Sequence, residues 1–233
     1  MMNIAVIPAR GGSKRVPRKN IRQFSGRPMI SYAITAAKKS SLFEHIVVST
    51  DDEEIARIAR EWGAQTPFIR PAELADDSTG TVPVIAHAIQ EMNAGMVCPD
   101  YVCCIYPCVP FLTCEDLSVG LDALVSADVD FVYPVTEYPH PVQRAMRRTA
   151  EGKMEFLFPD HELSSTHTLE KTFHDTGQFY WGKASAWLAH GRMHSDGLGM
   201  VIPKWRVVDI DTDDDWRRAE LMFKVQRPAP SML

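Results

Sequence analysis

Asn3-Ile4-Ala5-Val6-Ile7-Pro8 is a short apolar run near the start of the chain, and it leads directly into Ala9-Arg10-Gly11-Gly12-Ser13-Lys14-Arg15-Val16-Pro17-Arg18-Lys19-Asn20. A run of this length, bounded by turn residues, is typical of a buried strand. The glycine pair and the cations behind it are typical of a loop whose backbone approaches an anion. In α/β proteins, ligands bind beside the carboxyl ends of the strands. The stretch therefore predicts an open α/β sheet with a ligand site at its first strand.

The rest of the chain continues the alternation of short β-branched runs and helical patterns, which is the signature of a sheet covered by helices. We predict strands over residues 3–8, 45–50, 67–69, 101–106, 131–135, 178–181 and 206–209. We predict helices over residues 28–40, 51–63, 82–92, 114–126 and 213–225. Between residues 136 and 174 the alternation of strands and helices stops, and the sequence is polar and contains several prolines. This pattern indicates an inserted lobe.

The charge of the chain is unevenly distributed. The 233 residues include 25 Lys and Arg and 30 Asp and Glu, for a formal net charge of -5, which argues against a dedicated nucleic-acid binder. The first 43 residues nevertheless carry nine basic residues and no acidic one. A positive patch on an acidic protein indicates a small anionic ligand. The basic residues are Arg10, Lys14, Arg15, Arg18, Lys19, Arg22, Arg27, Lys38 and Lys39.

The sequence also predicts a soluble protein of the cytoplasm that does not associate with membranes. The start of the chain lacks a basic region followed by a long apolar one, so we expect no export signal. The longest apolar stretch, residues 101–112, is broken by Pro107 and Pro110 and falls short of the ~20 residues that span a bilayer. The five cysteines form no CxxC pair, and we expect them to be structural thiols in a reducing compartment.

Two interpretations are open for the loop that follows the first strand. It can be a solvated basic loop, or it can bind a polyphosphate through glycine backbone, the Ser13 hydroxyl and the cations that follow. It is neither a Walker A loop nor a GxGxxG fingerprint, because the glycine spacing differs from both. Its position at the end of the first strand favours the polyphosphate.

These residues carry a family resemblance. The segment IPARGGSKRVPRKN, residues 7–20, resembles the signature of the CMP-sugar synthetases, the acylneuraminate cytidylyltransferases that activate sialic-acid-like nonulosonic acids. The resemblance continues through residues 47–51 (VVSTD), 69–74 (IRPAEL) and 209–212 (DIDT). Within the family the chain resembles the pseudaminic acid branch most, through residues 77–81 (DSTGT), 83–89 (PVIAHAI), 104–106 (CIY) and 174–182 (HDTGQFYWG).

The resemblance implies a Rossmann-like nucleotide-diphospho-sugar transferase fold and a reaction in which the anomeric hydroxyl of a nine-carbon acidic sugar attacks the α-phosphorus of CTP. It implies that the CTP-binding residues are Ala9, Arg10, Gly11, Gly12, Ser13, Lys14, Lys19, Asn20, Arg70, Gly80 and Thr81. It assigns catalytic roles to Arg10, Lys14, Lys19 and Asp211. For Arg70, a plain surface arginine is the alternative. No general base can be identified from the residues.

Asp209 and Asp211 are the candidate metal ligands. They flank one residue at the end of a predicted strand, so both side chains would point the same way and could hold Mg²⁺ together with substrate phosphates. The alternative is an acidic entrance to the last helix, an interpretation that suits Asp213, Asp214 and Asp215. The family has the same pair in the same late position, which favours Mg²⁺ as cofactor.

The sugar site is predicted from both halves of the chain. Tyr106 stands where sialic-acid synthetases have a glutamine that contacts the sugar, and Arg144 could pair with the sugar carboxylate. Alternation places one pair of side chains on each face of the strand at residues 178–181, so one pair can line a pocket while the other packs inside. Core packing is the alternative for any single aromatic. The expected sugar-binding residues are Tyr106, Gln143, Arg144, Gln178 and Tyr180.

The predicted domain organisation is a nucleotide-binding α/β domain over residues 1–133 and 176–226, a lobe over residues 134–175, and a mobile tail over residues 227–233. The resemblance implies that the lobe forms a homodimer contact and contributes to the sugar site. Three alternatives stay open: an N-acylneuraminate or legionaminate cytidylyltransferase, a glycosyltransferase with a DxD pair, and a non-catalytic nucleotide-binding protein. Pyrophosphate release with different sugars would distinguish them.

Overall fold

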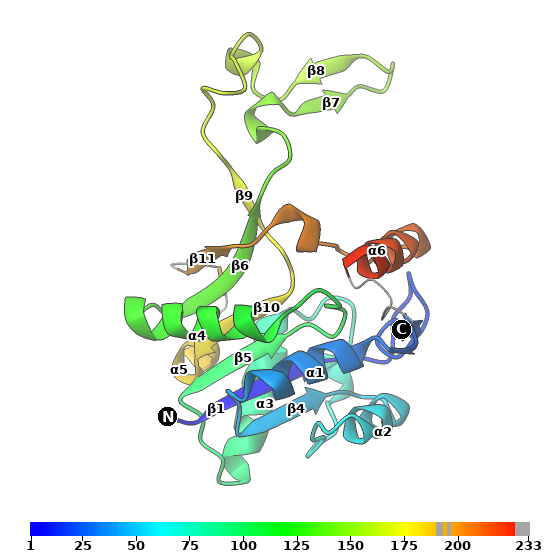
Figure 1. The fold of residues 1–233 in the computed structure, drawn as a ribbon, viewed down its shortest axis with the longest axis vertical. Helices are drawn as coiled ribbons and strands as arrows, with labels where there is room; N and C mark the ends of the chain where they lie inside the picture. Colours follow the sequence, from blue (N-terminus) through cyan, green and yellow to red (C-terminus); the bar gives the residue numbers. More distant parts are fainter. Residues whose placement is uncertain (190–192, 195–196, 227–233) are drawn as a thin grey trace, which may run out of the picture.

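The computed structural model describes residues 1–189, 193–194 and 197–226. Within these residues the core is a seven-stranded sheet in which β11, β6, β10, β5, β1 and β4 lie side by side and β9 pairs with β6 (Figure 1). β1 runs parallel to β4 and β5, β11 runs parallel to β6, and β9 and β10 run antiparallel to their neighbours. The strands are β1 (Asn3–Pro8), β4 (His45–Ser49), β5 (Tyr101–Ile105), β6 (Phe131–Glu137), β9 (Phe173–Asp175), β10 (Phe179–Lys183) and β11 (Leu198–Val201).

Helices cover both faces of the sheet because the strand residues alternate between two apolar layers. Ala5 and Ile7 of β1 face α1 (Ile30–Ser40), α2 (Glu53–Glu61) and α4 (Cys114–Ala127), whereas Ile4 and Val6 face α3 (Thr81–Ala94) and α5 (Ala184–Ala189). Gly120 permits a close contact between α4 and β10, since a Cβ there would lie 2.8 Å from Cδ1 of Trp181. The core is thus two apolar layers separated by the sheet, as expected for the predicted α/β sheet covered by helices.

A third apolar cluster lies at the edge of the sheet where β1, β4 and β5 end. The last helix, α6 (Asp213–Gln226), contributes Trp216, Ala219 and Phe223 to it, and the loop after β1 contributes Val16. Phe24, from the short pair β2 (Gln23–Phe24) and β3 (Arg27–Pro28), stacks edge-on against Trp216 at 5.5 Å. This cluster brings the first 30 and the last 20 described residues together although they are far apart in sequence (Figure 1).

The predicted lobe is an arm that projects from the sheet (Figure 1). β6 and β9 form its base, and the hairpin of β7 (Met146–Arg148) and β8 (Met154–Phe156) lies near its tip. Short 3-10 turns at Val142–Arg144 and Pro159–His161 connect these pieces. The predicted mobile tail, residues 227–233, lies outside the described residues.

Two strand predictions are wrong. Residues 67–69 form no strand, and pairing beside β4 is limited to a single bridge between Val47 and Gln65. The segment predicted as a strand at residues 206–209 begins in a 3-10 turn at Lys204–Arg206 and continues as coil over residues 207–209. The strand in this part of the chain is β11, which was not predicted. Among the described residues, no helix is long and apolar enough to cross a membrane.

Candidate active site

The loop after β1 is fixed at both ends and at its centre. Asn20, which is buried, donates from Nδ2 to the carbonyl oxygen of Arg10 over 2.9 Å and so joins the two ends. The backbone N of Gly11 donates to Oδ1 of Asp51 over 2.9 Å, and a Cβ at Gly11 would lie 2.7 Å from Oδ2 of Asp52. Val16 is buried in the third cluster. Because these contacts fix the backbone of the loop, they also position the polar side chains that lie between them.

Arg18 also connects the loop to the turn between β4 and α2. Its backbone has φ of 55°, a left-handed conformation that a side chain disfavours. Its guanidinium contacts Asp52, the N-cap of α2, and Glu54. The hydrogen bond from Arg18 lowers the pKa of Asp52, so the carboxylate stays charged and keeps this contact at neutral pH.

Most of the predicted phosphate-binding residues meet in one cavity of about 440 Å³. Four cations and two acids line it together with hydroxyl and amide groups: Arg10, Lys14, Arg15, Lys19, Asp77, Asp211, Ser13 and Asn20. Ala9 is fully buried beneath the loop and donates its N–H to the carbonyl of Ser49 over 2.9 Å. At Gly12 an added Cβ would meet nothing within 4 Å, so the backbone there is open to a ligand. The excess of cations suits a polyanion.

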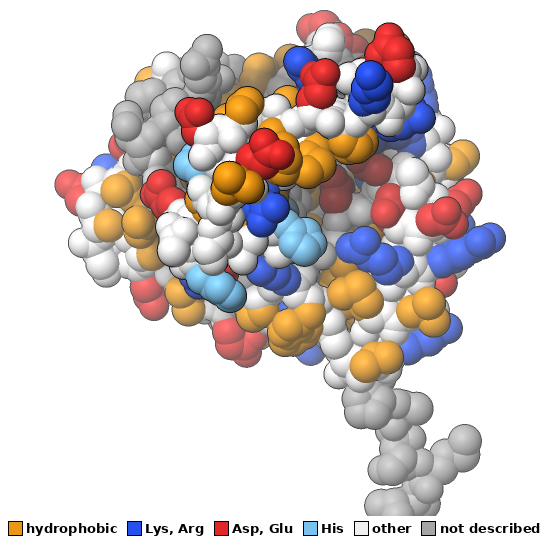
Figure 2. Space-filling view, turned by 90° about the horizontal axis from the view of Figure 1, so that it is seen from above, with side chains coloured by type: hydrophobic (Ala, Val, Ile, Leu, Met, Phe, Trp, Pro, Cys, Tyr) orange, Lys and Arg blue, Asp and Glu red, His pale blue; other side chains and the backbone are white. Residues whose placement is uncertain are grey.

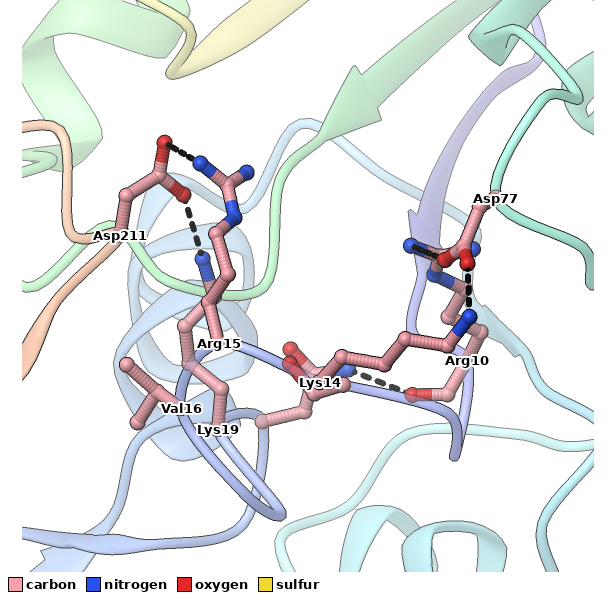
Figure 3. A pocket seen from close by; sticks show the side chains of 9 residues that line it. Arg10, Lys14, Arg15, Val16, Lys19, Asp77 and Asp211 are labelled. Atoms are coloured by element: carbon pink, nitrogen blue, oxygen red, sulfur yellow. Dashed lines mark hydrogen bonds and ion pairs between the residues drawn. The ribbon is translucent and has the colours of Figure 1, made fainter.

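The cations in this cavity are paired with its two acids (Figure 3). Arg10 Nη2 lies 2.8 Å from Oδ1 of Asp77, and Lys14 Nζ contacts Oδ2 of the same carboxylate. On the other wall, Arg15 Nη1 lies 2.7 Å and Lys19 Nζ lies 3.5 Å from the oxygens of Asp211. Lys19 also donates to the carbonyl of Ile210 over 2.6 Å. An anionic ligand must therefore exchange places with carboxylates.

Arg70 is held apart from this cavity. It is 4% exposed and donates from Nε to Oγ of Ser49 over 3.0 Å and from Nη2 to the Ser49 carbonyl. Burial lowers the pKa of Arg70 to about 10, so it remains charged at neutral pH. Gly80 and Thr81 form the start of α3, and Thr81 Oγ1 lies 2.6 Å from the hydroxyl of Tyr106. Neither Arg70 nor this pair lines the first cavity.

A second cavity of about 110 Å³ adjoins the first, since Lys19 and Asn20 line both. Its wall includes three of the residues predicted for the sugar or the metal: Tyr106, Gln178 and Asp209. Gln178 is 6% exposed, and its Nε2 donates to the carbonyl of Arg206 over 2.9 Å. The common wall means that ligands in the two cavities would meet beside Lys19 and Asn20.

Tyr180 is packed behind that wall. It is 2% exposed, its ring lies 5.4 Å from that of Tyr106, and its hydroxyl donates to Oδ2 of Asp175. Phe179 and Trp181 face the opposite apolar layer, which confirms the predicted alternation along β10. Tyr180 therefore supports Tyr106 from behind and does not line either cavity.

Gln143 and Arg144 lie in the arm and line neither cavity. Both belong to the 3-10 turn Val142–Arg144. Gln143 Nε2 donates to the carbonyl of Glu170 across the arm over 3.1 Å. Within one chain, the arm does not bring these two side chains to the other predicted sugar residues.

Asp209 and Asp211 lie on the coil before α6, where Asp209 lines the second cavity and Asp211 lines the first, so the predicted strand does not orient them. Partial burial and then the nearby Asp211 charge raise the pKa of Asp209. Two carboxylates that repel each other provide the hard oxygen ligands that Mg²⁺ prefers, so the pair fits a divalent cation. Among the described residues no group of three or more His, Cys, Asp or Glu side chains could hold a metal, so further ligands would come from substrate and water.

The comparisons with known proteins identify the family. Residues 4–180 match the family model described as cytidylyltransferase. The chain belongs to this family. A pseudaminic acid cytidylyltransferase from Campylobacter jejuni is 38% identical to this cytidylyltransferase over 228 residues, which cover 97% of each chain. A CMP-N,N'-diacetyllegionaminic acid synthase from Legionella pneumophila is 30% identical over 233 residues, which cover 98% of this chain and 99% of the relative.

The solved structures support the fold of the cytidylyltransferase. A CMP:2-keto-3-deoxy-manno-octonic acid synthetase complexed with CTP superimposes with a TM-score of 0.70 at 13% identity, covering 97% of this chain and 100% of that one. Identity this low shows the fold alone. The family resemblance and the nucleotide-diphospho-sugar transferase type of fold predicted from the sequence are thereby confirmed, and the family match removes the reason to favour a DxD glycosyltransferase.

Some residues of the cytidylyltransferase site were not predicted. Asp77 pairs with two phosphate-loop cations, and Asp175 fixes Tyr180. Arg206 lines the second cavity and pairs with Asp116 of α4. Each acid acts through a partner more than three residues away in sequence, so spacing gave no signal for them. Arg15 belonged to the predicted basic loop, and only the fold shows that it contacts Asp211.

Proposed function

We propose that this cytidylyltransferase joins CTP to pseudaminic acid, giving the CMP-sugar and pyrophosphate. The observation that carries the proposal is the pair of adjoining cavities, one cationic and one lined by Tyr106 and Gln178, with Lys19 and Asn20 in their common wall. The anomeric hydroxyl oxygen forms a bond to the α-phosphorus. The bond from that phosphorus to the bridging oxygen breaks, pyrophosphate leaves with the electron pair, and the hydroxyl proton is lost to solvent.

The chain's own groups would act mainly by holding the triphosphate. Arg10 and Lys14 on one wall and Lys19 on the other can contact its oxygens, and the open backbone of Gly12 lies in the same loop. Fixed cations at the site where charge develops on the leaving pyrophosphate lower the barrier without reorganisation. Lys19 lies where the cavities meet and is therefore the candidate for the α-phosphate.

Asp209 and Asp211 would hold Mg²⁺ in this proposal. When bound, the ion would neutralise phosphate charge and polarise phosphoryl oxygens. Asp211 would then exchange its contacts with Arg15 and Lys19 for a ligand role, and both cations would become free to contact phosphate.

Asp77 competes with the triphosphate for two cations. Its removal should therefore strengthen CTP binding, whereas most substitutions in the site should weaken it. Lys14 and Arg10 lower the pKa of Asp77, so it is charged at neutral pH and must be displaced by CTP. We expect Asp77→Asn to tighten CTP binding about two- to fivefold, the effect of an exposed ion pair. Calorimetry would measure it, with Asp160→Asn in the arm as control; weaker binding in Asp77→Asn would contradict the competition.

The sugar specificity is tested by a panel. We expect the purified enzyme, with CTP and Mg²⁺, to release pyrophosphate with pseudaminic acid at a kcat/KM at least about tenfold above that with legionaminic or N-acetylneuraminic acid, the effect of one or two hydrogen bonds. The 38% identical C. jejuni relative and the tyrosine at position 106 support this order. No pyrophosphate with any of the sugars would contradict the synthetase function, and release with N-acetylneuraminic acid alone would contradict the pseudaminic assignment.

We also propose that the arm forms a homodimer and that Gln143 and Arg144 reach the sugar site of the partner. The arm exposes an unusual share of large apolar side chains, and Figure 2, which looks down on it, shows hydrophobic groups among the charges. Leu163 is 97% exposed. The others are Tyr138, Met146, Met154, Leu157, Phe158 and Phe173. Burial of such a surface would stabilise a dimer.

Sedimentation tests the dimer. We expect wild type to sediment as a dimer, and Leu163→Asp to raise the dimer dissociation constant about tenfold or more, because it places a charge in an apolar interface. Leu221→Asp on the exposed face of α6 is the matched control. A wild-type monomer at working concentration would contradict the proposal.

We place this enzyme in the cytoplasm as part of the same proposal. All five cysteines are free thiols, and two of them, Cys103 and Cys104, are fully buried on β5. Disulfides form in oxidising compartments, so a chain with this many unpaired thiols suits a reducing one.

A further inference from the structure

The segment that carries Asp209 and Asp211 reaches the site without a strand ladder. It leaves β11 at Ile202, whose N–H donates to the carbonyl of Val135 over 2.9 Å, and enters α6 at Asp213. Between these points residues 207–212 have no regular structure. A segment of this kind takes its position from side-chain contacts, so the contacts that fix it decide where the two aspartates lie.

The strongest of these contacts is a bidentate ion pair. Nη1 and Nη2 of Arg206 each donate over 2.8 Å to the two oxygens of Asp116. The side chains are 15% and 11% exposed, so water and salt screen this pair far less than the ion pairs of the first cavity. The fork geometry fixes the orientation of the guanidinium as well as its distance.

Asp116 is itself immobilised. It is the third residue of α4 and forms a capping box with Thr113, accepting from the N–H of Thr113 over 3.1 Å and from its hydroxyl over 2.8 Å. Among the residues that the structure describes, the polar groups that contact this carboxylate come from the start of α4 and from Arg206. The helix therefore gives Arg206 a rigid anchor.

Because Arg206 is anchored in this way, it can position two residues of the second cavity, Gln178 and Asp209. Its carbonyl accepts from Nε2 of Gln178 over 2.9 Å, so the amide in the cavity wall is oriented by the backbone of Arg206. Three residues further on, Asp209 lines the same cavity. Neither Asp116 nor Arg206 lines the cationic cavity.

We propose that the Arg206–Asp116 pair is a positioning device for the acceptor half of the site, which fixes the Gln178 amide and the part of the coil that bears Asp209, whereas Asp211 is held by Arg15 and Lys19. The inference rests on the proposed function, in which these groups contact the sugar and Mg²⁺. It makes a specific demand: loss of the pair impairs sugar and metal binding and spares the binding of CTP alone. A role confined to fold stability would affect all three equally.

The test uses Arg206→Met, Arg206→Lys and Asp116→Asn, the double variant Asp116→Asn/Arg206→Met, and Arg60→Met as control. Arg60 forms an exposed ion pair with Glu53 at 2.7 Å on α2, away from the coil. Kinetics give the KM for sugar and the half-saturating Mg²⁺ concentration. Calorimetry gives the Kd for CTP without metal or sugar. Electron paramagnetic resonance gives the Kd of Mn²⁺ for the enzyme–CTP complex without sugar, and thermal unfolding reports the folded state.

We expect Arg206→Met to raise the KM for sugar and the Kd for Mn²⁺ about 10- to 100-fold, the usual effect of removing a group that orients a ligand. The metal-free Kd for CTP should change less than about twofold. Arg206→Lys, which keeps the charge and loses the fork, should lie between Arg206→Met and wild type. The double variant should match Arg206→Met, because the pair acts as one unit.

Proportional changes in all three constants, additive effects in the double variant, or wild-type constants in a folded Arg206→Lys and Asp116→Asn would each overturn the proposal. Failure of the proposed function is seen separately. A wild type that releases no pyrophosphate with any sugar contradicts that function, while the Mn²⁺ titration still decides the role of the pair. If Asp211→Asn leaves the Kd for Mn²⁺ unchanged, the assignment of Asp211 as a metal ligand fails. The KM for sugar in the Arg206 and Asp116 variants then decides whether the pair is a positioning device.

Discussion

Replacing Asp211 with asparagine is expected to lower the rate of pyrophosphate release about 10²- to 10³-fold, the usual effect of removing one charged group from a reaction centre. The loss comes from the metal site, because Asp209 would remain as the single carboxylate for the metal. The contacts of Asp211 with Arg15 and Lys19, at 2.7 Å and 3.5 Å, are given up in the reacting wild type as well and do not add to the effect. The isosteric amide preserves the packing of the coil before α6.

The measurement is pyrophosphate release at saturating CTP and sugar, with circular dichroism to verify the fold. Asp214→Asn is the matched control, because the Asp214 side chain is 94% exposed and contacts Arg217 in the same helix at 3.8 Å. Turnover close to wild type in a folded Asp211→Asn would refute the assignment of Asp211.

Replacing Arg10 with methionine is expected to raise the Kd for CTP about 10- to 100-fold. A hydrogen bond to a charged group contributes about 1.5–3 kcal/mol, and each 1.4 kcal/mol is a factor of ten in affinity. Arg10 is two-thirds buried, at 34% side-chain exposure, so screening by solvent is moderate. The substitution also leaves Asp77 with Lys14 alone, which adds to the repulsion felt by the triphosphate.

Calorimetric titration of CTP over a range of salt concentrations measures this effect. Arg57→Met, which removes an exposed ion pair with Glu61 on α2, is the control. We expect the salt dependence of binding to weaken in Arg10→Met, because fewer charges are engaged. An unchanged Kd and salt slope would show that Arg10 does not contact the nucleotide. In the Asp77→Asn background the loss should be smaller, since the competing carboxylate is gone.

The sequence predicted those parts of the fold that local patterns determine. β1 occupies the predicted residues, and the alternation of Ile4 and Val6 against Ala5 and Ile7 separates two apolar layers. The predicted strand at residues 67–69 failed because this short apolar run forms no ladder with a neighbour in the sheet. β11 escaped detection because Gly197 and Gly199 interrupt its pattern, although Gly199 packs closely on Val135 of β6.

For the site, as for the fold, local patterns in the sequence predicted some features, and contacts between distant segments determined the others. Residues of one contiguous loop, from Arg10 to Asn20, come together because the loop is short and begins at a strand. The pairing of Asp77 with Arg10 and of Arg206 with Asp116 depends on how distant segments fold back, which no local spacing encodes. The strand predicted before Asp209 is absent from the structure, because the ion pair between Arg206 and Asp116 takes the place of a ladder there.

The two carboxylates in the cationic cavity affect which anions can bind there. Without ligand, Asp77 and Asp211 neutralise much of the charge of Arg10, Lys14, Arg15 and Lys19. A single inorganic phosphate would break contacts on one wall and gain little in return, whereas a triphosphate spans both walls and replaces all of them. We therefore expect the cavity to favour a triphosphate over a single phosphate, so that small anions compete poorly with the nucleotide.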